Sequence, residues 1–175
     1  MTNNHPLAGY IRDIPDYPVE GVMFKDICPL LQNPEALQKS VKALVELTAG
    51  MNIDIIAAPD ARGFIFGVPV ALQLQCGFIP IRKPGKLPYE TAAYEYELEY
   101  GTDTLEMHVD AVTRGMRVLL VDDLLATGGT ITACCDLLEQ QGAVVTGCCF
   151  LIELDFLGGR ERLLPRNVQS VIQYD

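Results

Sequence analysis

The most informative segment of the chain is residues 117–130, which read Arg117-Val118-Leu119-Leu120-Val121-Asp122-Asp123-Leu124-Leu125-Ala126-Thr127-Gly128-Gly129-Thr130. The apolar run at its start predicts a strand buried on both faces, as in a parallel sheet, that ends at Asp122. Small residues follow, and the amphipathic run 131–141 predicts a helix. The segment therefore predicts a strand, a loop and a helix, with two carboxylates where the strand ends.

The loop of this segment, residues 126–130, has the composition of an anion-binding loop. Glycines permit positive φ and a close approach of the backbone to a ligand, and the helix N-terminus adds partial positive charge. Asp122 and Asp123 do not bind phosphate themselves, but they suit hydroxyl groups or a metal ion. The implied ligand is therefore a sugar phosphate. The sequence contains neither a Gly-x-x-x-x-Gly-Lys run nor a Gly-x-Gly-x-x-Gly run, which excludes the P-loop and dinucleotide motifs.

Each of these features alone also has a plain structural interpretation. Paired acids often follow buried strands in α/β sheets, and Gly-Gly before a helix often forms only a turn. Their order in one segment favours the functional interpretation.

The remaining chain repeats the alternation of strands and helices. A helix is expected from Pro34, capped by Asn33, and another from the turn 60–64 to about Gln75, ended by Gly77. Buried strands are expected at residues 53–59, 77–82, 118–122 and 144–152. Such alternation predicts a parallel sheet, which binds ligands beyond the carboxyl ends of its strands.

Composition limits the class of protein. The 175 residues are 49% hydrophobic, enough for one globular domain over residues 1–175. Thirteen basic and 23 acidic residues give a net charge of −10, and only Arg82, Lys83 and Lys86 form a basic group, so a nucleic-acid-binding surface is not expected. No signal peptide or membrane-spanning run is evident, so we expect no membrane partner and a cytoplasmic location.

The six cysteines are expected to be free and mostly buried. Cys134-Cys135 and Cys148-Cys149 are adjacent pairs within apolar runs, and no Cys-x-x-Cys occurs. With only two histidines in the chain, a structural zinc site is not expected either.

Residues 83–115 are too long for a plain connection and predict a β-hairpin. Apolar or aromatic residues alternate with polar ones on both sides of the turn 101–103: Tyr94, Tyr96, Leu98, Tyr100, Leu105, Met107 and Val109. Two interpretations remain open from the pattern: a half-buried ribbon at the edge of the molecule, or a mobile lid over the ligand site.

The segment from Asp122 to Thr130 resembles the phosphoribosyl pyrophosphate motif of type I phosphoribosyltransferases, in the form that adenine phosphoribosyltransferases have. The resemblance extends from Ile11 to Tyr174. It implies an α/β fold with a central, mostly parallel sheet flanked by helices. It also implies a small hood over about residues 8–30, a flexible hairpin lid over about residues 83–110, and a homodimer.

The resemblance implies two sets of contacts to phosphoribosyl pyrophosphate. The ribose 5-phosphate part would be bound by Asp122, Asp123, Ala126, Thr127, Gly128, Gly129 and Thr130. The pyrophosphate part would be bound by Asp60, Ala61, Arg62, Lys83, Lys86 and Tyr100. A guanidinium suits phosphate because it donates to two oxygens at once. The alternatives are a surface ion pair for Arg62 and solvated side chains for the lysines. Ala58-Pro59 departs from the family pattern just before the pyrophosphate turn.

The resemblance also implies the base site and the catalytic acid. Backbone groups of Met23 and Lys25 would read the adenine edge, with Phe24 stacked on one face of the base and Leu154 on the other; Phe24 and Leu154 could equally be core residues. Glu99 is the implied catalytic residue. Spacing alone does not distinguish it from the neighbouring acids Glu95, Glu97 and Glu106.

The implied activity is purine salvage. The enzyme would transfer the 5-phosphoribosyl group from 5-phosphoribosyl-1-pyrophosphate to adenine, releasing AMP and pyrophosphate, with Mg²⁺ held mainly by substrate and water. A 6-oxopurine phosphoribosyltransferase for xanthine or for hypoxanthine and guanine is disfavoured, because Ala126 stands where those enzymes usually carry an acid. A transcriptional regulator that senses phosphoribosyl pyrophosphate is disfavoured by the absence of a DNA-binding domain or a basic face.

Overall fold

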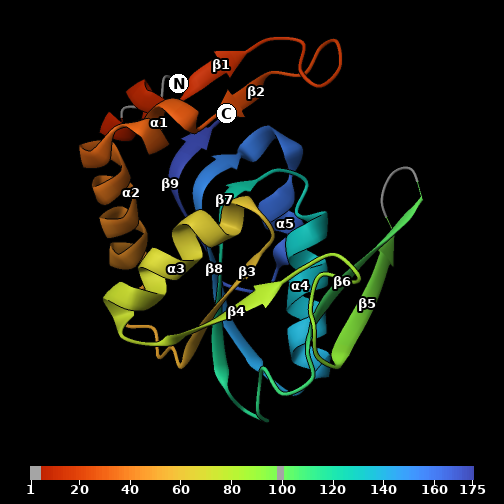
Figure 1. Cartoon of the computed structure of the whole chain (residues 1–175). Helices are drawn as coiled ribbons and strands as arrows, with labels where there is room; N and C mark the ends of the chain where they lie inside the picture. Colours follow the sequence, from red (N-terminus) through yellow and green to blue (C-terminus); the bar gives the residue numbers. More distant parts are fainter. Residues whose placement is uncertain (1–4, 98–100) are drawn as a thin grey trace.

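A five-stranded sheet forms the centre of the protein, in a computed structural model that describes residues 5–97 and 101–175. Its strands follow the order β4 (Gly77–Ile81), β3 (Ile55–Pro59), β7 (Arg117–Leu125), β8 (Val144–Leu154) and β9 (Val168–Tyr174). Every neighbouring pair is parallel. The expected α/β fold with a parallel sheet is confirmed, and Figure 1 shows helices on both of its faces.

Alternate residues of the central strands supply two separate cores. Leu119 and Val121 of β7 point to the face covered by α2 (Pro34–Leu47) and α3 (Arg62–Leu74). Val118 and Leu120 point to the opposite face, against α4 (Gly129–Gln140). This is the burial on both faces that the apolar run predicts. The cap of α2 is also as expected, because Asn33 Oδ1 accepts a hydrogen bond from the backbone N–H of Ala36 at 2.9 Å.

Several element boundaries differ from the sequence-based expectation, and one strand was not expected. Strand β7 continues past Asp122 to Leu125, because pairing with β8 holds it in register as far as Leu125 opposite Glu153. Helix α3 ends at Leu74, and the cap residue Gln75 takes the left-handed conformation with φ 56°, so Gly77 begins β4 instead of ending the helix. Strand β9 was not expected, since its alternating polar residues lack the apolar run of the central strands.

A small N-terminal unit lies above the carboxyl ends of the strands in Figure 1. It contains the 3-10 helix η1 (Pro6–Tyr10), the antiparallel pair β1 (Arg12–Ile14) and β2 (Phe24–Asp26), and the short helix α1 (Cys28–Gln32). The extended arm expected at residues 11–18 is present, and it forms β1 and the turn that follows. After β8, the 3-10 helix η2 (Asp155–Leu157) and α5 (Gly159–Leu163) connect to β9.

The predicted hairpin is β5 (Thr91–Glu97) and β6 (Thr102–His108), paired antiparallel. Its inner side is packed: Leu105 and Met107 are buried, and Tyr94 Oη lies 3.0 Å from Asp136 Oδ2 of α4. The body of the hairpin is therefore a half-buried ribbon. Its tip, which carries Glu99 and Tyr100, lies outside the described residues.

The described residues include all six cysteines and every assigned helix. All six cysteines are free, and Cys134, Cys135, Cys148 and Cys149 are buried, as expected. Residues 5–97 and 101–175 contain no cluster of three or more His, Cys, Asp or Glu placed to hold a metal ion. Within the same ranges, every helix is too short or too polar to cross a membrane.

Candidate functional site

A cleft of about 290 Å³ opens at the carboxyl ends of β3 and β7. The turn that follows β3 and the loop that follows β7 both contribute to its lining, as expected for ligand binding in a parallel sheet. The lining residues are Pro59, Asp60, Ala61, Arg62, Asp122, Asp123, Leu124, Leu125, Ala126, Thr127, Gly128, Thr130 and Ile131. Two segments predicted to bind phosphate groups, far apart in the sequence, therefore meet in one cleft.

The paired acids Asp122 and Asp123 both line this cleft. Asp123 is 2% exposed, and its backbone N–H donates to Asp122 Oδ1 at 2.8 Å. Burial raises the pKa of both carboxyls, and the charge of Asp123 raises the pKa of Asp122 further. Asp123 Oδ2 lies 3.1 Å from Arg62 Nε in an ion pair, but no described residue hydrogen-bonds to it. A buried acceptor of this kind suits a ligand hydroxyl.

The loop at residues 126–130 depends on a glycine. Gly128 has φ 78°, and a Cβ at this position would lie 2.9 Å from the carbonyl oxygen of Gly159. Helix α4 begins at the next residue, and both the backbone N–H and Oγ1 of Thr132 donate to Gly128 O at 2.9 Å. The loop thus leads directly into a helix N-terminus, which favours an anion. Gly129 is buried beside the cleft but does not line it.

The turn after β3 is held by ion pairs. Asp60 Oδ2 accepts from Arg82 Nε at 2.9 Å and lies 3.4 Å from Lys86 Nζ, and the Arg82 hydrogen bond is the main reason that the pKa of Asp60 is lowered. The Asp60–Ala61 peptide bond is cis. Arg62 pairs with Asp123, and both residues line the cleft. The partner is buried, so this is not the ion pair at the surface that was the alternative for Arg62.

The two predicted lysines lie outside the lining of the cleft. Lys86 pairs with Asp60, while Lys83 Nζ pairs with Asp103 of β6 and so connects the basic segment to the hairpin. Neither lysine is simply solvated. The prediction that they bind pyrophosphate stays a prediction.

None of the four residues predicted for the base lines the cleft. The ring centroid of Phe24 is 5.8 Å from Arg62 Cζ, which brings the hood to the edge of the cleft. Lys25 is buried by contacts to Asp13 and to the ring of Tyr174, so its side chain is structural. Leu154 is buried at the carboxyl end of β8, and Met23 is exposed.

Two glycines outside the predicted set also shape the cleft. A Cβ at Gly63 would lie 2.9 Å from Pro59 Cδ and 3.0 Å from Asp122 Oδ1, so α3 packs directly against the acids. A Cβ at Gly159 would lie 2.2 Å from the carbonyl oxygen of Ala126. The only signal for Gly159 in the sequence is its place in the pair Gly158-Gly159, far along the chain from the loop it contacts.

The cleft lies at the carboxyl ends of parallel strands, which is where α/β proteins of this kind bind their ligands. The family model of the phosphoribosyl transferase domain matches residues 29–172, which is most of the chain. The chain therefore belongs to the phosphoribosyltransferase family.

Its relatives within this family are adenine phosphoribosyltransferases. The chain is 55% identical to that of Rhodopirellula baltica over 96% of its own length and 82% of the relative's, and 55% identical to that of Roseiflexus sp. over 99% and 100%. Among solved structures, the adenine phosphoribosyltransferase of Thermoanaerobacter pseudethanolicus superimposes with a TM-score of 0.94 at 53% identity, covering 96% of this chain and 98% of that one. The Saccharomyces cerevisiae enzyme gives a TM-score of 0.88 at 40% identity, covering 94% and 96%. These relatives place the chain among the adenine phosphoribosyltransferases.

Proposed function

We propose that the chain transfers the 5-phosphoribosyl group from 5-phosphoribosyl-1-pyrophosphate to adenine, forming AMP and pyrophosphate in purine salvage. The observation that carries this proposal is a buried carboxylate oxygen, Asp123 Oδ2, without a hydrogen bond from any described residue, in a cleft that the loop before α4 also lines. An acceptor for hydroxyls next to a site for an anion matches ribose 5-phosphate. The chain acts as one domain, with the hood at about residues 8–30 and the lid at about residues 83–110.

The loop and the paired acids bind the ribose 5-phosphate part. Backbone N–H groups of Ala126, Thr127, Gly128, Gly129 and Thr130 surround the 5′-phosphate, and the N-terminus of α4 adds its partial positive charge. Asp122 and Asp123 accept hydrogen bonds from the ribose hydroxyls. Positive charge develops on the ribose as pyrophosphate leaves, and the negative field of the two acids stabilises that charge.

The pyrophosphate lies against the turn after β3 and the basic segment before the hairpin. Asp60 and Ala61 supply backbone contacts, while Arg62, Lys83, Lys86 and Tyr100 supply side chains. Arg62 and the two lysines are each paired with an aspartate, so a phosphate oxygen replaces or shares a partner that is already anionic. The exchange leaves each of the three half-exposed cations with an anionic partner.

Mg²⁺ is the proposed cofactor. Oxygens of substrate and water would supply most of its shell. Carboxylates of the cleft, which are the hard oxygen donors that Mg²⁺ prefers, would complete it. When bound, the ion neutralises charge on the departing pyrophosphate.

Adenine binds between the hood and the end of β8. Phe24 stacks on one face, Leu154 covers the other, and the backbone of Met23 and Lys25 reads the edge of the base. The Saccharomyces cerevisiae enzyme was solved with adenine and an imino-altritol bisphosphate, which supports a base site next to a site for phosphate groups. Glu99 accepts the N9 proton that adenine loses, or hydrogen-bonds to it.

The experiment that tests the function is a competition between adenine and hypoxanthine at equal concentration, with Mg²⁺ and phosphoribosyl pyrophosphate. We expect AMP as the main product, because a 6-oxo group leaves buried polar atoms of the hood unpaired, at about 1–3 kcal/mol for each group. Comparable yields of AMP and IMP contradict the base assignment and favour a 6-oxopurine enzyme. The absence of any nucleotide product contradicts phosphoribosyl transfer and favours a sensor of the substrate.

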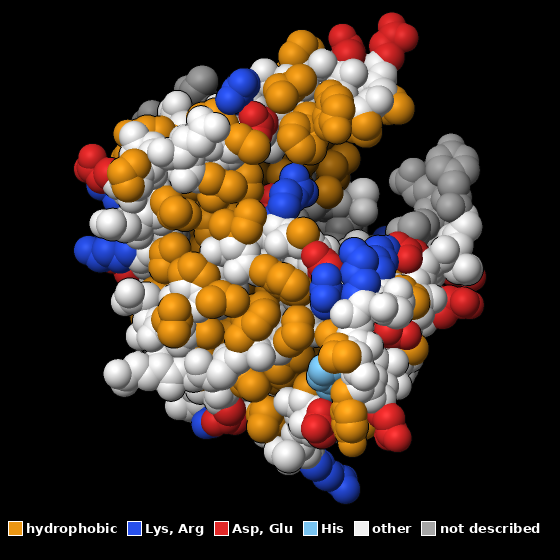
Figure 2. Space-filling model, in the orientation of Figure 1, with side chains coloured by type: hydrophobic (Ala, Val, Ile, Leu, Met, Phe, Trp, Pro, Cys, Tyr) orange, Lys and Arg blue, Asp and Glu red, His pale blue; other side chains and the backbone are white. Residues whose placement is uncertain are grey.

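A homodimer and a cytoplasmic location complete the proposal. Figure 2 shows hydrophobic side chains gathered on the face formed by α2 and α3. Ile65, Val68 and Leu72 of α3 are exposed there, next to a groove of about 700 Å³ lined by residues of both helices. A second copy would bury this apolar surface. Six free cysteines are typical of a reducing compartment.

A further inference from the structure

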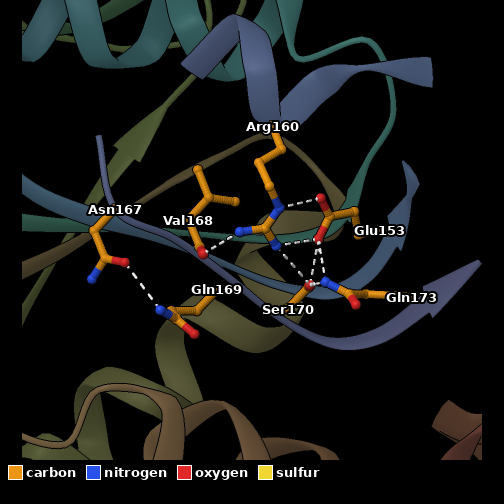
Figure 3. Close-up of polar contacts among 7 residues, drawn as sticks. All are labelled: Glu153, Arg160, Asn167, Val168, Gln169, Ser170 and Gln173. Atoms are coloured by element: carbon orange, nitrogen blue, oxygen red, sulfur yellow. Dashed lines mark hydrogen bonds and ion pairs between the residues drawn. The ribbon is translucent and has the colours of Figure 1, made fainter. Parts of the chain in front are cut away.

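A buried carboxylate that the proposed mechanism does not use lies at the end of β8. Glu153 is 1% exposed, and Figure 3 shows its carboxylate facing Arg160 of α5 and Ser170 and Gln173 of β9. Arg160 makes a two-pronged contact, Nε to Oε1 at 2.8 Å and Nη2 to Oε2 at 2.5 Å. Ser170 Oγ and Gln173 Nε2 also donate to Oε2.

The balance of forces keeps this carboxylate charged. Burial raises the pKa of Glu153, but hydrogen bonds from Arg160, Ser170 and Gln173 outweigh the effect of burial, so that the pKa lies below its ordinary value. Arg160 is also fixed on its other side, because Nη1 donates to the carbonyl oxygen of Val168 at 2.7 Å. Helix α5 is therefore fastened to both β8 and β9 through one side chain.

Gly159, the residue before Arg160, lies directly against the anion-binding loop at residues 126–130. A Cβ at Gly159 would lie 2.2 Å from Ala126 O and 2.9 Å from Leu125 Cδ1, and a Cβ at Gly128 would lie 2.9 Å from Gly159 O. The start of α5 and the loop thus meet backbone to backbone, with no side chain between them to absorb a shift. A displacement of α5 must displace the loop or open a gap behind it.

We infer that Glu153 and Arg160 are positioning residues for the ribose 5-phosphate site: their ion pair holds Gly159 against Ala126 and Gly128 and so fixes the shape of the anion-binding loop. This inference rests on the proposed function of that loop. Neither Glu153 nor Arg160 lines the cleft, so both act through Gly159 and not on the ligand.

The test measures binding of ribose 5-phosphate to the whole chain by titration calorimetry, with wild type compared to Arg160→Gln. We expect the Kd to rise by about 10- to 100-fold, because a small misplacement of a binding group has effects of this size. In turnover assays, the KM for phosphoribosyl pyrophosphate should rise more than kcat falls. Arg160→Lys keeps the charge without the two-pronged contact and should restore part of the affinity.

The matched control is Arg117→Gln. Arg117 also makes a two-pronged contact to a carboxylate, Asp54, but at the opposite end of the sheet from the cleft. We expect its loss to lower the melting temperature without changing the Kd for ribose 5-phosphate. An equal loss of affinity in both variants would reduce the Arg160 effect to general destabilisation and overturn the inference.

Gly159→Ala provides a second variant that does not touch the ion pair. Its added methyl group collides with Ala126 O, so the Kd should rise as in Arg160→Gln. If Arg160→Gln does not fold, Arg160→Lys and Gly159→Ala decide, and wild-type affinity in both folded proteins overturns the inference. Wild type that binds ribose 5-phosphate but does not convert adenine contradicts the proposed reaction alone, and a fall in affinity in Arg160→Gln still supports positioning.

Discussion

Asp122 and Asp123, the proposed ribose-binding acids, have features that distinguish a binding residue from a structural one. Asp123 is buried and Asp122 is partly buried, and a charged carboxylate is unfavourable there unless hydrogen bonds compensate it. The compensation is incomplete, because Asp123 Oδ2 has only the ion pair with Arg62 among the described residues. A pair of acids kept at a cost to stability is typical of a site whose partner is the ligand.

The double substitution Asp122→Asn and Asp123→Asn should lower turnover strongly while raising the melting temperature. Removal of two buried like charges stabilises the fold by about 0.5–2 kcal/mol, equivalent to about 2–4 °C for each kcal/mol. The lost Arg62 pair offsets little, because that guanidinium is half-exposed. Calorimetric melting and a turnover assay with Mg²⁺ measure the two effects. Full turnover in this variant would show that the acids are structural.

The same pair predicts a dependence of stability on pH. A carboxyl whose pKa is raised in the folded state carries no penalty below its ordinary pKa, near 4, and the penalty grows as the pH rises through the raised folded pKa. The melting temperatures of wild type and the double variant should therefore diverge from about pH 4 upward. A difference that is constant with pH would contradict the assignment of buried, raised carboxyls.

Gly128 and Gly129 are neighbours that should respond differently to substitution. A Cβ at Gly129 would lie 3.5 Å from Arg162 Nη1, an ordinary contact, whereas Gly128 combines φ 78° with a contact of 2.9 Å to Gly159 O. Gly129→Val should thus stay folded but lose ribose 5-phosphate binding, because the branched side chain blocks approach of the anion. Gly128→Val should lose at least about 1–3 kcal/mol of stability. Thermal melts and calorimetric titration separate the two, and unchanged affinity in folded Gly129→Val would refute the loop assignment.

At the scale of elements, the sequence predicts those whose signal is local. The strand at residues 118–121 is uniformly apolar because both faces are covered, and Asn33-Pro34 starts a helix through its own hydrogen bonding. The end of β7 has no local signal in the sequence, because the partner strand β8 determines how far the pairing continues. Strand β9 lies at the edge of the sheet with a mixed pattern, and only its pairing to β8 defines it.

The catalytic role of Glu99 in the hairpin stays a prediction, because Glu99 lies outside the described residues. Glu99→Gln should reduce kcat by about 10²–10⁴-fold with little change in substrate affinity, if the carboxylate handles the N9 proton of adenine. Glu97→Gln, at the exposed end of β5, is the matched control and should retain kcat. Steady-state kinetics over a range of pH measures both. Equal effects of the two substitutions, or a normal kcat and pH profile in Glu99→Gln, would remove Glu99 from the catalytic role.

At the scale of the whole molecule, the cleft forms where two segments that are far apart in the sequence meet. The turn after β3 and the loop after β7 are about 60 residues apart in sequence, and they meet because parallel neighbours end at the same edge. That convergence could be predicted. The contact of Gly159 with Ala126 and the contact of Lys25 with Tyr174 could not, because they depend on how α5 and the hood pack across the ends of the strands.

The apolar face of α3 makes a prediction about assembly. Leu72 is 72% exposed, and Val68 is exposed one turn earlier on the same helix, which is costly for a face in water. Wild type should therefore sediment as a dimer of the 19.2 kDa chain, and Val68→Asp with Leu72→Asp should shift it to monomer by placing charges in the interface. Analytical ultracentrifugation over a range of concentrations measures this shift.

The control for assembly is the substitution Val144→Asp. Val144 is an exposed apolar residue at the start of β8, away from α3. It should leave the sedimentation coefficient unchanged, because a single exposed apolar side chain outside a patch needs no partner. If the double variant stays folded by circular dichroism and still sediments as a dimer, the interface lies elsewhere. If wild type is a monomer at all concentrations, the proposed homodimer is wrong. That result would not affect the proposed function of the cleft, because the residues that line the cleft lie at the carboxyl ends of the strands and not on this face of α3.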